Sequence, residues 1–275
     1  MDCLSELSYA APRKDQFPLQ SSSWRNALYD ILSSVEGNNA AEDDNAADDN
    51  PIVLVKNSKY VCTYDKFPKA RYHLLLMCRE HSTNPSCLIN VKSLNDLKVD
   101  HLDELREFHN FAKSIVAAIR DADSDSFKIG YHSIPSLHPL HLHIISTDLD
   151  SPCLTTRKHI ISFSSDFFVS SDELENHLES AFVDSISVAV RAQRAHDVLD
   201  STPLQCQYCG RVAVTVPDFK RHNQTCPKAT APDKSELAHN DNGDVHFNSL
   251  LGWTSKRDLV QNSTASGKKR SRSDN

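Results

Sequence analysis

Residues 137–147 constrain this chain most, because they combine the alternation of a β-strand with two histidines on one side. With a period of two residues, His141 and His143 share one face, and the leucine and isoleucine residues between and beside them point to the other. We therefore expect a strand with one packed face and one face that is available for chemistry.

Two other interpretations of this histidine run are open. It could be an ordinary half-buried strand whose outward face carries histidines, or a metal site, since imidazoles are common metal ligands. No Asp or Glu lies within the run to complete a set of ligands. We therefore favour covalent chemistry at a histidine over a zinc centre there.

The run His141-Leu142-His143-Ile144-Ile145 is similar to the core of the histidine-triad (HIT) family signature, His-φ-His-φ-His-φ-φ, in which φ is apolar. Pro139 stands where that signature has its first histidine, and His138 lies one residue away. The resemblance implies that His141, at the middle position, is a nucleophile that attacks a nucleotide α-phosphorus.

A second stretch resembles the other landmark of the same family, Asp-x-x-Pro-x-Ala-x-x-His, matched by Asp65, Pro68, Ala70 and His73. Alone, Asp65 would be an ordinary turn-capping residue. Together, the two motifs imply that Asp65 binds ribose hydroxyls and that His73 lies near the triad.

The length and charge of the chain limit its organisation. The 275 residues suffice for one sizeable core with an appendage, or for two small domains. The net charge of −7 argues against a chain that is basic throughout. Much of the acidity lies in residues 37–50, a low-complexity stretch that we expect to be a flexible insertion.

Eight cysteines do not imply disulfides here, because residues 1–6 begin without the apolar segment of an export signal. We expect thiols or metal ligands in a reducing compartment. No apolar stretch approaches the roughly 20 residues that cross a bilayer, so no membrane partner is expected.

Periodicity predicts an α+β domain over residues 21–200, with an antiparallel sheet and flanking helices, and the family resemblance implies that this sheet is HIT-like. Residues 1–20 lack any period and are expected to form a disordered arm. The expected strands cover residues 52–56, 60–64, 72–77, 127–134 and the histidine run, and the expected helices cover residues 24–34, 100–120 and 171–195.

Residues 201–230 have the ligand spacing of a zinc finger. Cys206-x2-Cys209 is followed after twelve residues by His222-x3-Cys226, a C2H2 pattern with cysteine at the last position. Thiolates and imidazole at this spacing can surround Zn²⁺ tetrahedrally, and four protein ligands indicate a structural ion. A segment this short, with Phe219 as its small core, would need the metal to fold.

Residues 231–275 are polar and are expected to form a disordered tail. They include the basic cluster Lys268–Arg272, which is compatible with a nuclear-import signal and also with an ordinary tail. The expectation is a nuclear location, and otherwise a cytoplasmic one.

A HIT domain followed by this finger resembles the DNA-repair branch of the HIT family, which removes AMP from the 5′ end of DNA after an abortive ligation. The resemblance covers about residues 22–226 and includes Phe67–His73, Gly130–Ser136 and Asp150–Pro152. Many proteins of that branch carry an N-terminal phosphopeptide-binding domain. About twenty residues precede Trp24, so a short form without that domain is expected.

The resemblance implies covalent catalysis, in which His141 takes the AMP and water then releases it. It makes His132 the candidate for acid assistance or for holding the departing phosphate, although His132 and His73 could also be structural. Lys69, Ser136 and His143 would stabilise charge on the reacting phosphates. No catalytic metal is expected.

For DNA, the resemblance implies recognition of an end or nick rather than of a sequence, because phosphate contacts carry no sequence information. The helix beginning at Trp24 would stack on the terminal base pair. The residues expected to hold the backbone are Arg157, Lys158, His159, Lys220 and Arg221.

Two alternatives to this repair hydrolase are kept. One is a general HIT-family adenosine phosphoramidase or dinucleotide hydrolase that acts on small nucleotides. The other is a non-catalytic zinc-finger DNA-binding protein with a decayed HIT domain, which only the substitution at Pro139 favours.

Overall fold

The computed structural model describes six stretches of the chain, and every structural statement below concerns these residues. They are residues 7–18, 23–36, 50–79, 87–119, 126–180 and 196–228. Within them, no helix is long and apolar enough to span a membrane. The chain divides into two compact units, Met1–Leu204 and Gln205–Asn275, and each is described by itself.

Several expected features lie outside the described residues. They are nearly all of the acidic insertion at 37–50, the end of the helix expected at 171–195, and the tail with its basic cluster Lys268–Arg272. The predictions made for them stay predictions.

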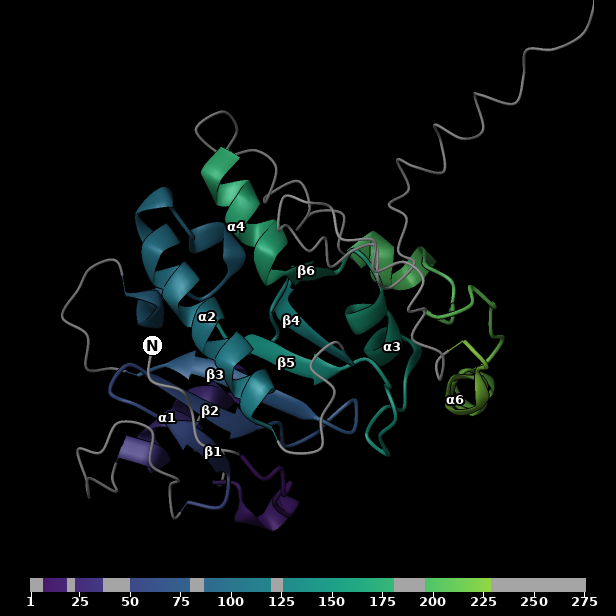
Figure 1. Cartoon of the computed structure of the whole chain (residues 1–275), viewed down its shortest axis with the longest axis horizontal. Helices are drawn as coiled ribbons and strands as arrows, with labels where there is room; N and C mark the ends of the chain where they lie inside the picture. The colour runs from purple at the N-terminus through teal and green to yellow at the C-terminus, as the bar shows by residue number, and fades with distance from the viewer. Residues whose placement is uncertain are drawn as a thin grey trace, which may run out of the picture. The chain divides into compact units, whose positions relative to one another are not determined.

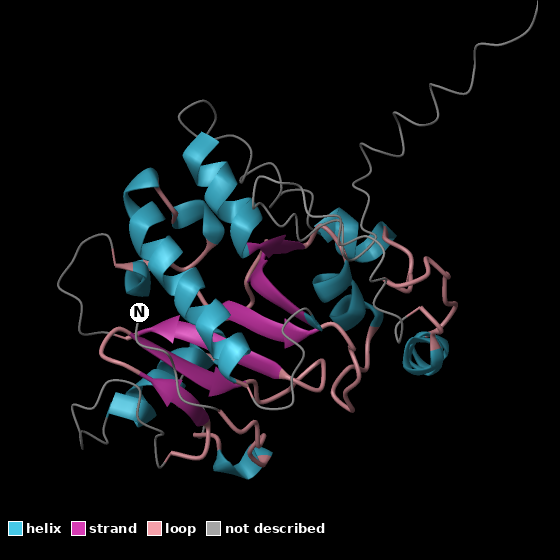
Figure 2. Ribbon diagram, viewed as in Figure 1, coloured by secondary structure: helices cyan, strands magenta, loops and turns pink. Residues whose placement is uncertain are grey.

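The first unit is built on one six-stranded antiparallel sheet, drawn in magenta in Figure 2, in the order β1-β2-β3-β5-β4-β6. The strands are β1 (Val53–Lys56), β2 (Tyr60–Tyr64), β3 (His73–Cys78), β4 (Phe127–His132), β5 (Leu142–Ser146) and β6 (Phe168–Ser170). The helices of this unit are α1 (Ala27–Glu36), α2 (Leu102–Ala118), α3 (Arg157–Ser164) and α4 (Ser171–Ser180). The predicted α+β class with a HIT-like antiparallel sheet is confirmed.

Strands β3 and β5 are neighbours at the centre of the sheet, and every residue in both is buried. Leu74 pairs with Ile144, and Leu75 pairs with His143. A strand covered on both faces needs apolar residues on both, which explains the run of three leucines in β3. The histidines of the two sequence motifs are therefore held by the most deeply buried strands.

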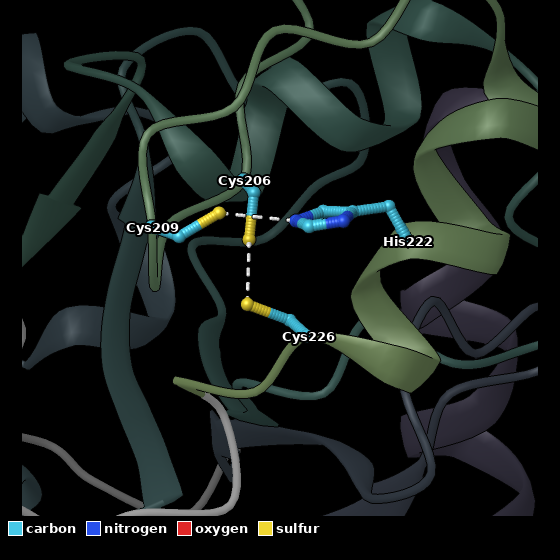
Figure 3. A group of neighbouring side chains, drawn as sticks. All are labelled: Cys206, Cys209, His222 and Cys226. Carbon is cyan, nitrogen blue, oxygen red and sulfur yellow. Dashed lines mark hydrogen bonds between the residues drawn. The ribbon is translucent and has the colours of Figure 1, made fainter.

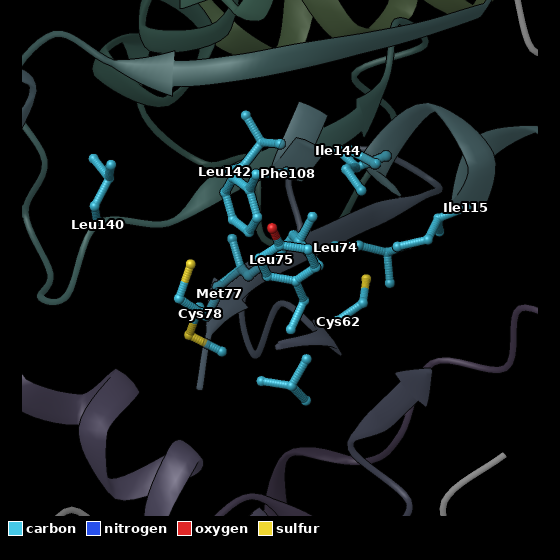
Figure 4. Close-up of a cluster of buried hydrophobic side chains, with 14 of the residues drawn as sticks. Cys62, Leu74, Leu75, Met77, Cys78, Phe108, Ile115, Leu140, Leu142 and Ile144 are labelled. Carbon is cyan, nitrogen blue, oxygen red and sulfur yellow. The ribbon is translucent and has the colours of Figure 1, made fainter. Parts of the chain in front are cut away.

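Helix α2 supplies one wall of the core. Its stripe of apolar residues packs against the sheet, and Figure 4 shows Phe108 and Ile115 of α2 among side chains of β2, β3 and β5. Helices α2 and α4 lie side by side in Figure 1, and Lys113 forms an ion pair with Asp172 at 3.0 Å between them. The spacing in the sequence predicted α2 to within two residues at each end.

Residues 7–18 are packed against the first unit, which corrects the expectation of a disordered arm over residues 1–20. Leu7 and Phe17 are buried, and Leu7 forms an isolated bridge with Ile119. The apolar residues of this segment are too few and too unevenly spaced to show a period. Only its tertiary contacts reveal its structure.

The segment that carries Arg157, Lys158 and His159 is helix α3, which the sequence analysis did not predict. Thr156 caps the helix, and its Oγ1 accepts a hydrogen bond from the backbone N–H of His159 at 3.2 Å. Eight residues are too short a helix for its period to stand out in the sequence.

The histidine strand is also shorter than expected, because β5 begins only at Leu142. The peptide bond between His138 and Pro139 is cis. The backbone N–H of His138 donates to Arg25 O at 2.7 Å, and that of Leu140 donates to Val91 O at 2.8 Å. Residues 138–140 are therefore paired with loops instead of with β3.

In the second unit, residues 205–228 form a small module. Gln205 pairs with Val212 in an isolated bridge, and between them Gly210 has a φ of 75°, a conformation that favours glycine. Helix α6 (Val216–Thr225) follows, capped by Thr215. Phe219 is buried, as the sequence predicted.

Candidate functional site

Four histidines that the sequence singled out lie close together across the neighbouring strands β3, β5 and β4. His73 begins β3, His132 ends β4, His143 lies in β5, and His141 directly precedes β5. The ring centre of His143 is 4.4 Å from that of His132, 4.9 Å from that of His141 and 5.3 Å from that of His73. Residues about 70 positions apart thus form one cluster around His143.

Hydrogen bonds within this cluster determine which ring nitrogens carry protons. The backbone N–H of Lys69 donates to Nδ1 of His73 at 3.1 Å, so the proton of the neutral His73 ring is on Nε2. That Nε2 lies 3.0 Å from Nδ1 of His143 and donates to it. The neutral His143 ring therefore carries its own proton on Nε2, an atom that is buried and has no partner among the described residues.

His141 has the opposite arrangement. Its Nδ1 lies 3.0 Å from the carbonyl oxygen of Pro139, which can only accept, so Nδ1 carries the proton. The lone pair of the neutral ring is then on Nε2, which makes no hydrogen bond with the described residues. A nucleophilic nitrogen (His141) and a hydrogen-bond donor (His143) thus stand next to each other.

Burial keeps these rings neutral. It lowers the pKa of His73 to about 4, and it lowers the pKa of His141, His143 and His132 below the ordinary imidazole value. The neighbouring imidazoles and the Lys69 ammonium lower the pKa of His143 further. A neutral imidazole is the form that attacks phosphorus.

An aromatic wall, which the sequence reasoning missed, causes much of this burial. The ring of Phe163 on α3 lies 4.7 Å from that of His132, 5.2 Å from that of His73 and 5.3 Å from that of His143, between ring centres. In the sequence, Phe163 is only the end of a short apolar run, so no local signal indicates its role.

The turn before β3 carries the residues expected to bind the nucleotide. Oδ1 of Asp65 accepts from the backbone N–H of Phe67 at 2.6 Å, and its Oδ2 lies 3.7 Å from Nε2 of His73. The ammonium of Lys69 donates to the carbonyl oxygen of Phe67. Ser136 is exposed on the loop between β4 and β5, and its side chain forms no hydrogen bond with the described residues.

One triad of this site has the composition of a metal centre, since ligand atoms of Asp65, His73 and His143 lie within 4.8 Å of one another. Asp65 supplies the carboxylate that the histidine run lacks. The hydrogen bonds favour a proton between His73 Nε2 and His143 Nδ1 over a metal ion at this position. The reason is that the backbone N–H of Lys69 already donates to Nδ1, the other ring nitrogen of His73. For Nε2 to bind a metal, its proton would have to move to Nδ1, against that donor.

Trp24, the expected stacking residue, lies in the short 3-10 helix Trp24–Asn26 that precedes α1 and is 53% exposed. The guanidinium of Arg25 lies 5.1 Å from its ring centre. Because Arg25 O accepts from His138 N, this segment is joined to the loop that leads to His141. The indole is exposed, and its stacking on a DNA end stays a prediction.

The three residues on α3 differ in what they can offer to DNA. The guanidinium of Arg157 donates to the carbonyl oxygens of Leu199, Asp200 and Thr202, so most of its hydrogen-bonding capacity is used within the protein. Lys158 is exposed and pairs with Asp200 at 3.2 Å. His159 accepts from the backbone N–H of Thr155 at 3.3 Å, and burial lowers its pKa.

The second unit brings its four predicted ligands together, as Figure 3 shows. Sγ of Cys206 lies 3.8 Å from Sγ of Cys226, and Sγ of Cys209 lies 3.1 Å from Nε2 of His222. Two thiolates bound tetrahedrally to zinc at about 2.3 Å would be about 3.8 Å apart. The cluster therefore fits a zinc ion.

The basic residues on α6 are partly neutralised. Asp218 pairs with Arg211 at 3.1 Å and with Arg221 at 3.4 Å, although Arg221 remains 75% exposed. Lys220, the other residue expected to contact DNA, lies beside them on the same helix.

Comparison with known proteins gives consistent results. Residues 38–159 match the family described as "Scavenger mRNA decapping enzyme C-term binding". Aprataxin of Danio rerio is 35% identical over 177 residues, covering 64% of this chain and 50% of that protein. Aprataxin of Gallus gallus is 34% identical over 174 residues, covering 63% and 50%. The chain thus spans about half the length of the curated relatives that it matches.

Among solved structures, the aprataxin ortholog Hnt3 in complex with DNA superimposes with a TM-score of 0.53 at 24% identity. The match covers 74% of this chain and 94% of that one. At this identity, the likeness concerns the fold.

Proposed function

Since this chain belongs to the aprataxin family of histidine-triad proteins, we propose that it is a DNA-repair hydrolase that removes AMP from 5′-adenylated ends left by abortive ligation. The observation that carries the proposal is the hydrogen bond from Nδ1 of His141 to Pro139 O, which leaves Nε2 as an unprotonated nucleophile.

In the first step, Nε2 of His141 attacks the adenylate phosphorus. A P–N bond forms, and the bond from that phosphorus to the bridging oxygen of the DNA 5′-phosphate breaks, so the repaired 5′-phosphate leaves. The adenylylated ring is then an imidazolium, whose remaining N–H still donates to Pro139 O. This hydrogen bond becomes stronger as positive charge develops on the ring.

Hydrogen-bond donors of the protein would stabilise the negative charge on the non-bridging oxygens of the adenylate phosphate. The Nε2–H of His143 has no partner among the residues that the structure describes, and its direction is set by the bond from His73. Lys69 supplies a cation from the turn before β3. Because such donors need no reorganisation during the reaction, they favour the transition state over the ground state.

His132 is better suited to holding phosphate than to donating a full proton. Burial and the neighbouring imidazoles lower its pKa well below the ordinary value, so the protonated ring is rare near neutral pH. Its Nε2 is shielded from solvent and has no partner among the described residues.

In the second step, water attacks the phosphorus and neutral His141 departs with its electron pair.

Recognition of the DNA end would come from Trp24, Lys158 and the zinc module. Exposed Trp24 can stack on a terminal base pair, which is worth about 1–3 kcal/mol per base. Zinc held by Cys206, Cys209, His222 and Cys226 would fold the module, and Lys220 and Arg221 would contact phosphates. The nuclear location suggested by residues 268–272 belongs to the same proposal.

The second candidate function is hydrolysis of small adenosine phosphoramidates or dinucleotides. The histidine cluster would serve either reaction, and the exposed Trp24 is what favours DNA. A general nucleotide hydrolase would turn over adenosine phosphoramidate as fast as adenylated DNA, and Trp24→Ala would leave both rates unchanged.

The test compares AMP release from 5′-adenylated nicked DNA by the wild type, His141→Ala and His138→Ala. We expect His141→Ala to lose activity by at least about a thousandfold, because it removes the nucleophile. His138→Ala is the matched control, since its ring bonds only the carbonyl of Lys92, and it should stay within about threefold of the wild type.

An alkaline quench during turnover, followed by mass spectrometry, should find AMP on His141 of the wild type. AMP release by His141→Ala at the normal rate, or AMP attached to another residue, would refute the mechanism.

A further inference from the structure

The hydroxyl of Tyr9 completes the end of the β2–β3 ladder. The backbone N–H of Asp65 donates to His73 O at 3.1 Å, and in an antiparallel pair the return bond would run from His73 N to Asp65 O. Instead, His73 N–H donates to the hydroxyl oxygen of Tyr9 at 3.2 Å. The tyrosine thus takes the place of a strand carbonyl.

Because the Tyr9 hydroxyl accepts this hydrogen bond in place of the Asp65 carbonyl, the chain can leave the sheet at Asp65 while His73 stays in it. The carbonyl of Asp65 is not needed by β3, so the chain can turn there and present the Asp65 carboxylate to the site. Because the backbone N–H of His73 would otherwise be a donor without a partner in a buried region, the Tyr9 hydroxyl also removes an energetic penalty.

Tyr9 is itself held by contacts on several sides. Its ring lies 5.1 Å from that of Tyr64 and 4.7 Å from that of Tyr72, both in edge-on contact. The following residue, Ala10, donates its backbone N–H to the Tyr64 hydroxyl at 3.2 Å. Before Tyr9, Leu7 N–H donates to Ala118 O at 2.7 Å. The hydroxyl of Tyr9 is therefore delivered at a defined position.

The same segment contacts the turn after Asp65 through two cation–π pairs. The ammonium of Lys14 lies 4.9 Å from the ring centre of Phe67, and that of Lys66 lies 5.7 Å from the ring centre of Phe17. Each pair joins residues 14–17 to residues 66–67, which follow Asp65 directly. A cation over an aromatic face is attractive at these distances.

We propose that Tyr9 is a positioning residue of the adenylate site and that residues 7–18 form a brace that holds His73 and the turn after Asp65. The inference rests on the proposed function for its kinetic readout. The brace acts through hydrogen bonds in series: Tyr9 fixes the backbone of His73, whose ring fixes that of His143, whose Nε2–H then points to the phosphate. Tyr9 touches neither substrate nor reacting atoms.

The test is Tyr9→Phe, with Tyr64→Phe as the matched control. Tyr9→Phe keeps the ring contacts and removes the hydrogen bond to His73, whereas Tyr64→Phe removes the hydrogen bond from Ala10 and leaves both the ring contacts and the Tyr9–His73 hydrogen bond in place. We expect kcat on adenylated nicked DNA to fall about fivefold in Tyr9→Phe, with KM within about twofold, and kcat to stay within about twofold in Tyr64→Phe.

A readout independent of activity is the long-range ¹H–¹⁵N spectrum of the histidine rings. His143 should be protonated on Nε2 in the wild type and Tyr64→Phe, and should show shifts averaged between tautomers in Tyr9→Phe. The proposal is overturned by wild-type kcat in Tyr9→Phe, by equal losses in both variants, or by an unchanged ring spectrum. The spectrum tests the brace even if AMP release does not depend on His141.

Discussion

At the scale of single residues, the site depends on where two protons sit. His141 and His143 are two positions apart, yet one exposes a lone pair and the other an N–H, because their Nδ1 atoms face an acceptor and a donor respectively. Protonation of His143 would remove the acceptor that receives the His73 N–H. The proposed reaction therefore depends on keeping the cluster neutral, which burial does by lowering the pKa of each ring.

The effect of burial on the pKa values of the histidine cluster can be tested at Phe163. Phe163→Leu should admit water to the cluster, so the pKa values of His73, His132 and His143 should rise toward 6.5. Because these pKa values are depressed in the wild type, raising them brings protonation to a higher pH. The acid limb of kcat/KM should move upward by about half to one pH unit.

The control for that profile is Phe108→Leu, which changes a buried ring that packs on Tyr60 instead of on the cluster. Its acid limb should coincide with that of the wild type, even if its stability falls. An identical shift in both variants would show that general loosening, and not loss of the aromatic wall, moves the profile.

At the scale of elements, helix α3 joins two parts of the first unit through Arg157. The guanidinium donates to three carbonyls in residues 199–202, at the end of the helical residues 196–201. Free carbonyls at a helix end need donors, and a fork of N–H groups suits several at once. Arg157 is therefore a structural residue, whereas its neighbour Lys158 is exposed.

Replacing Arg157 or Lys158 by alanine should have different effects on stability and on DNA affinity. Arg157→Ala should lower the free energy of unfolding by about 2 kcal/mol, because it removes charge-assisted hydrogen bonds, and should leave the salt dependence of DNA affinity unchanged. Lys158→Ala should cost about 0.5 kcal/mol or less, and should reduce that salt slope by about one. Urea unfolding measures the free energy of unfolding, and DNA titrations at several salt concentrations measure the salt slope. A large loss of stability in Lys158→Ala together with a reduced salt slope in Arg157→Ala would contradict the assignment.

At the scale of the whole molecule, the chain combines a unit with its own large core and a unit with almost none. In the described part of the second unit, Ala213 and Phe219 are the buried apolar residues besides the two buried cysteines. A core of this size does not offset the loss of conformational entropy, so a metal is needed for folding. The two units should therefore respond differently to a chelator.

Removal of zinc should unfold residues 205–228 and leave the first unit folded. A strong chelator, or Cys209→Ser, should raise KM for adenylated nicked DNA by about tenfold or more while turnover of adenosine phosphoramidate stays the same, because the histidine cluster lies in the other unit. Cys153→Ser is the matched control, since Cys153 is outside the cluster of ligands. Equal loss on both substrates would contradict this division.

Much of the fold was predictable because its signals are local. The short apolar runs of β1 and β2 and the 3.6-residue period of α2 report on burial within a single element. The spacing of Cys206, Cys209, His222 and Cys226 likewise encodes a site whose ligands are close in the chain. The assignment of His141 as the nucleophile rests on a motif of adjacent residues and stays a prediction.

Other features were not predictable because they join distant residues. The donor state of His143 depends on Lys69 and His73, about 70 residues earlier, and Arg157 binds carbonyls more than 40 residues later. Residues 7–18 have no period at all, and their role arises from contacts with β2 and β3.

By itself, the sequence predicted strands β1 to β5, the long helix and the four candidate metal ligands, because each depends on residues within one turn, strand or motif. Only the tertiary structure decided which nitrogen of each imidazole carries the proton, which arginine is occupied within the protein, and that residues 7–18 contact the segment around His73. These depend on partners that the folded chain brings within hydrogen-bonding distance, and no local pattern records such distances.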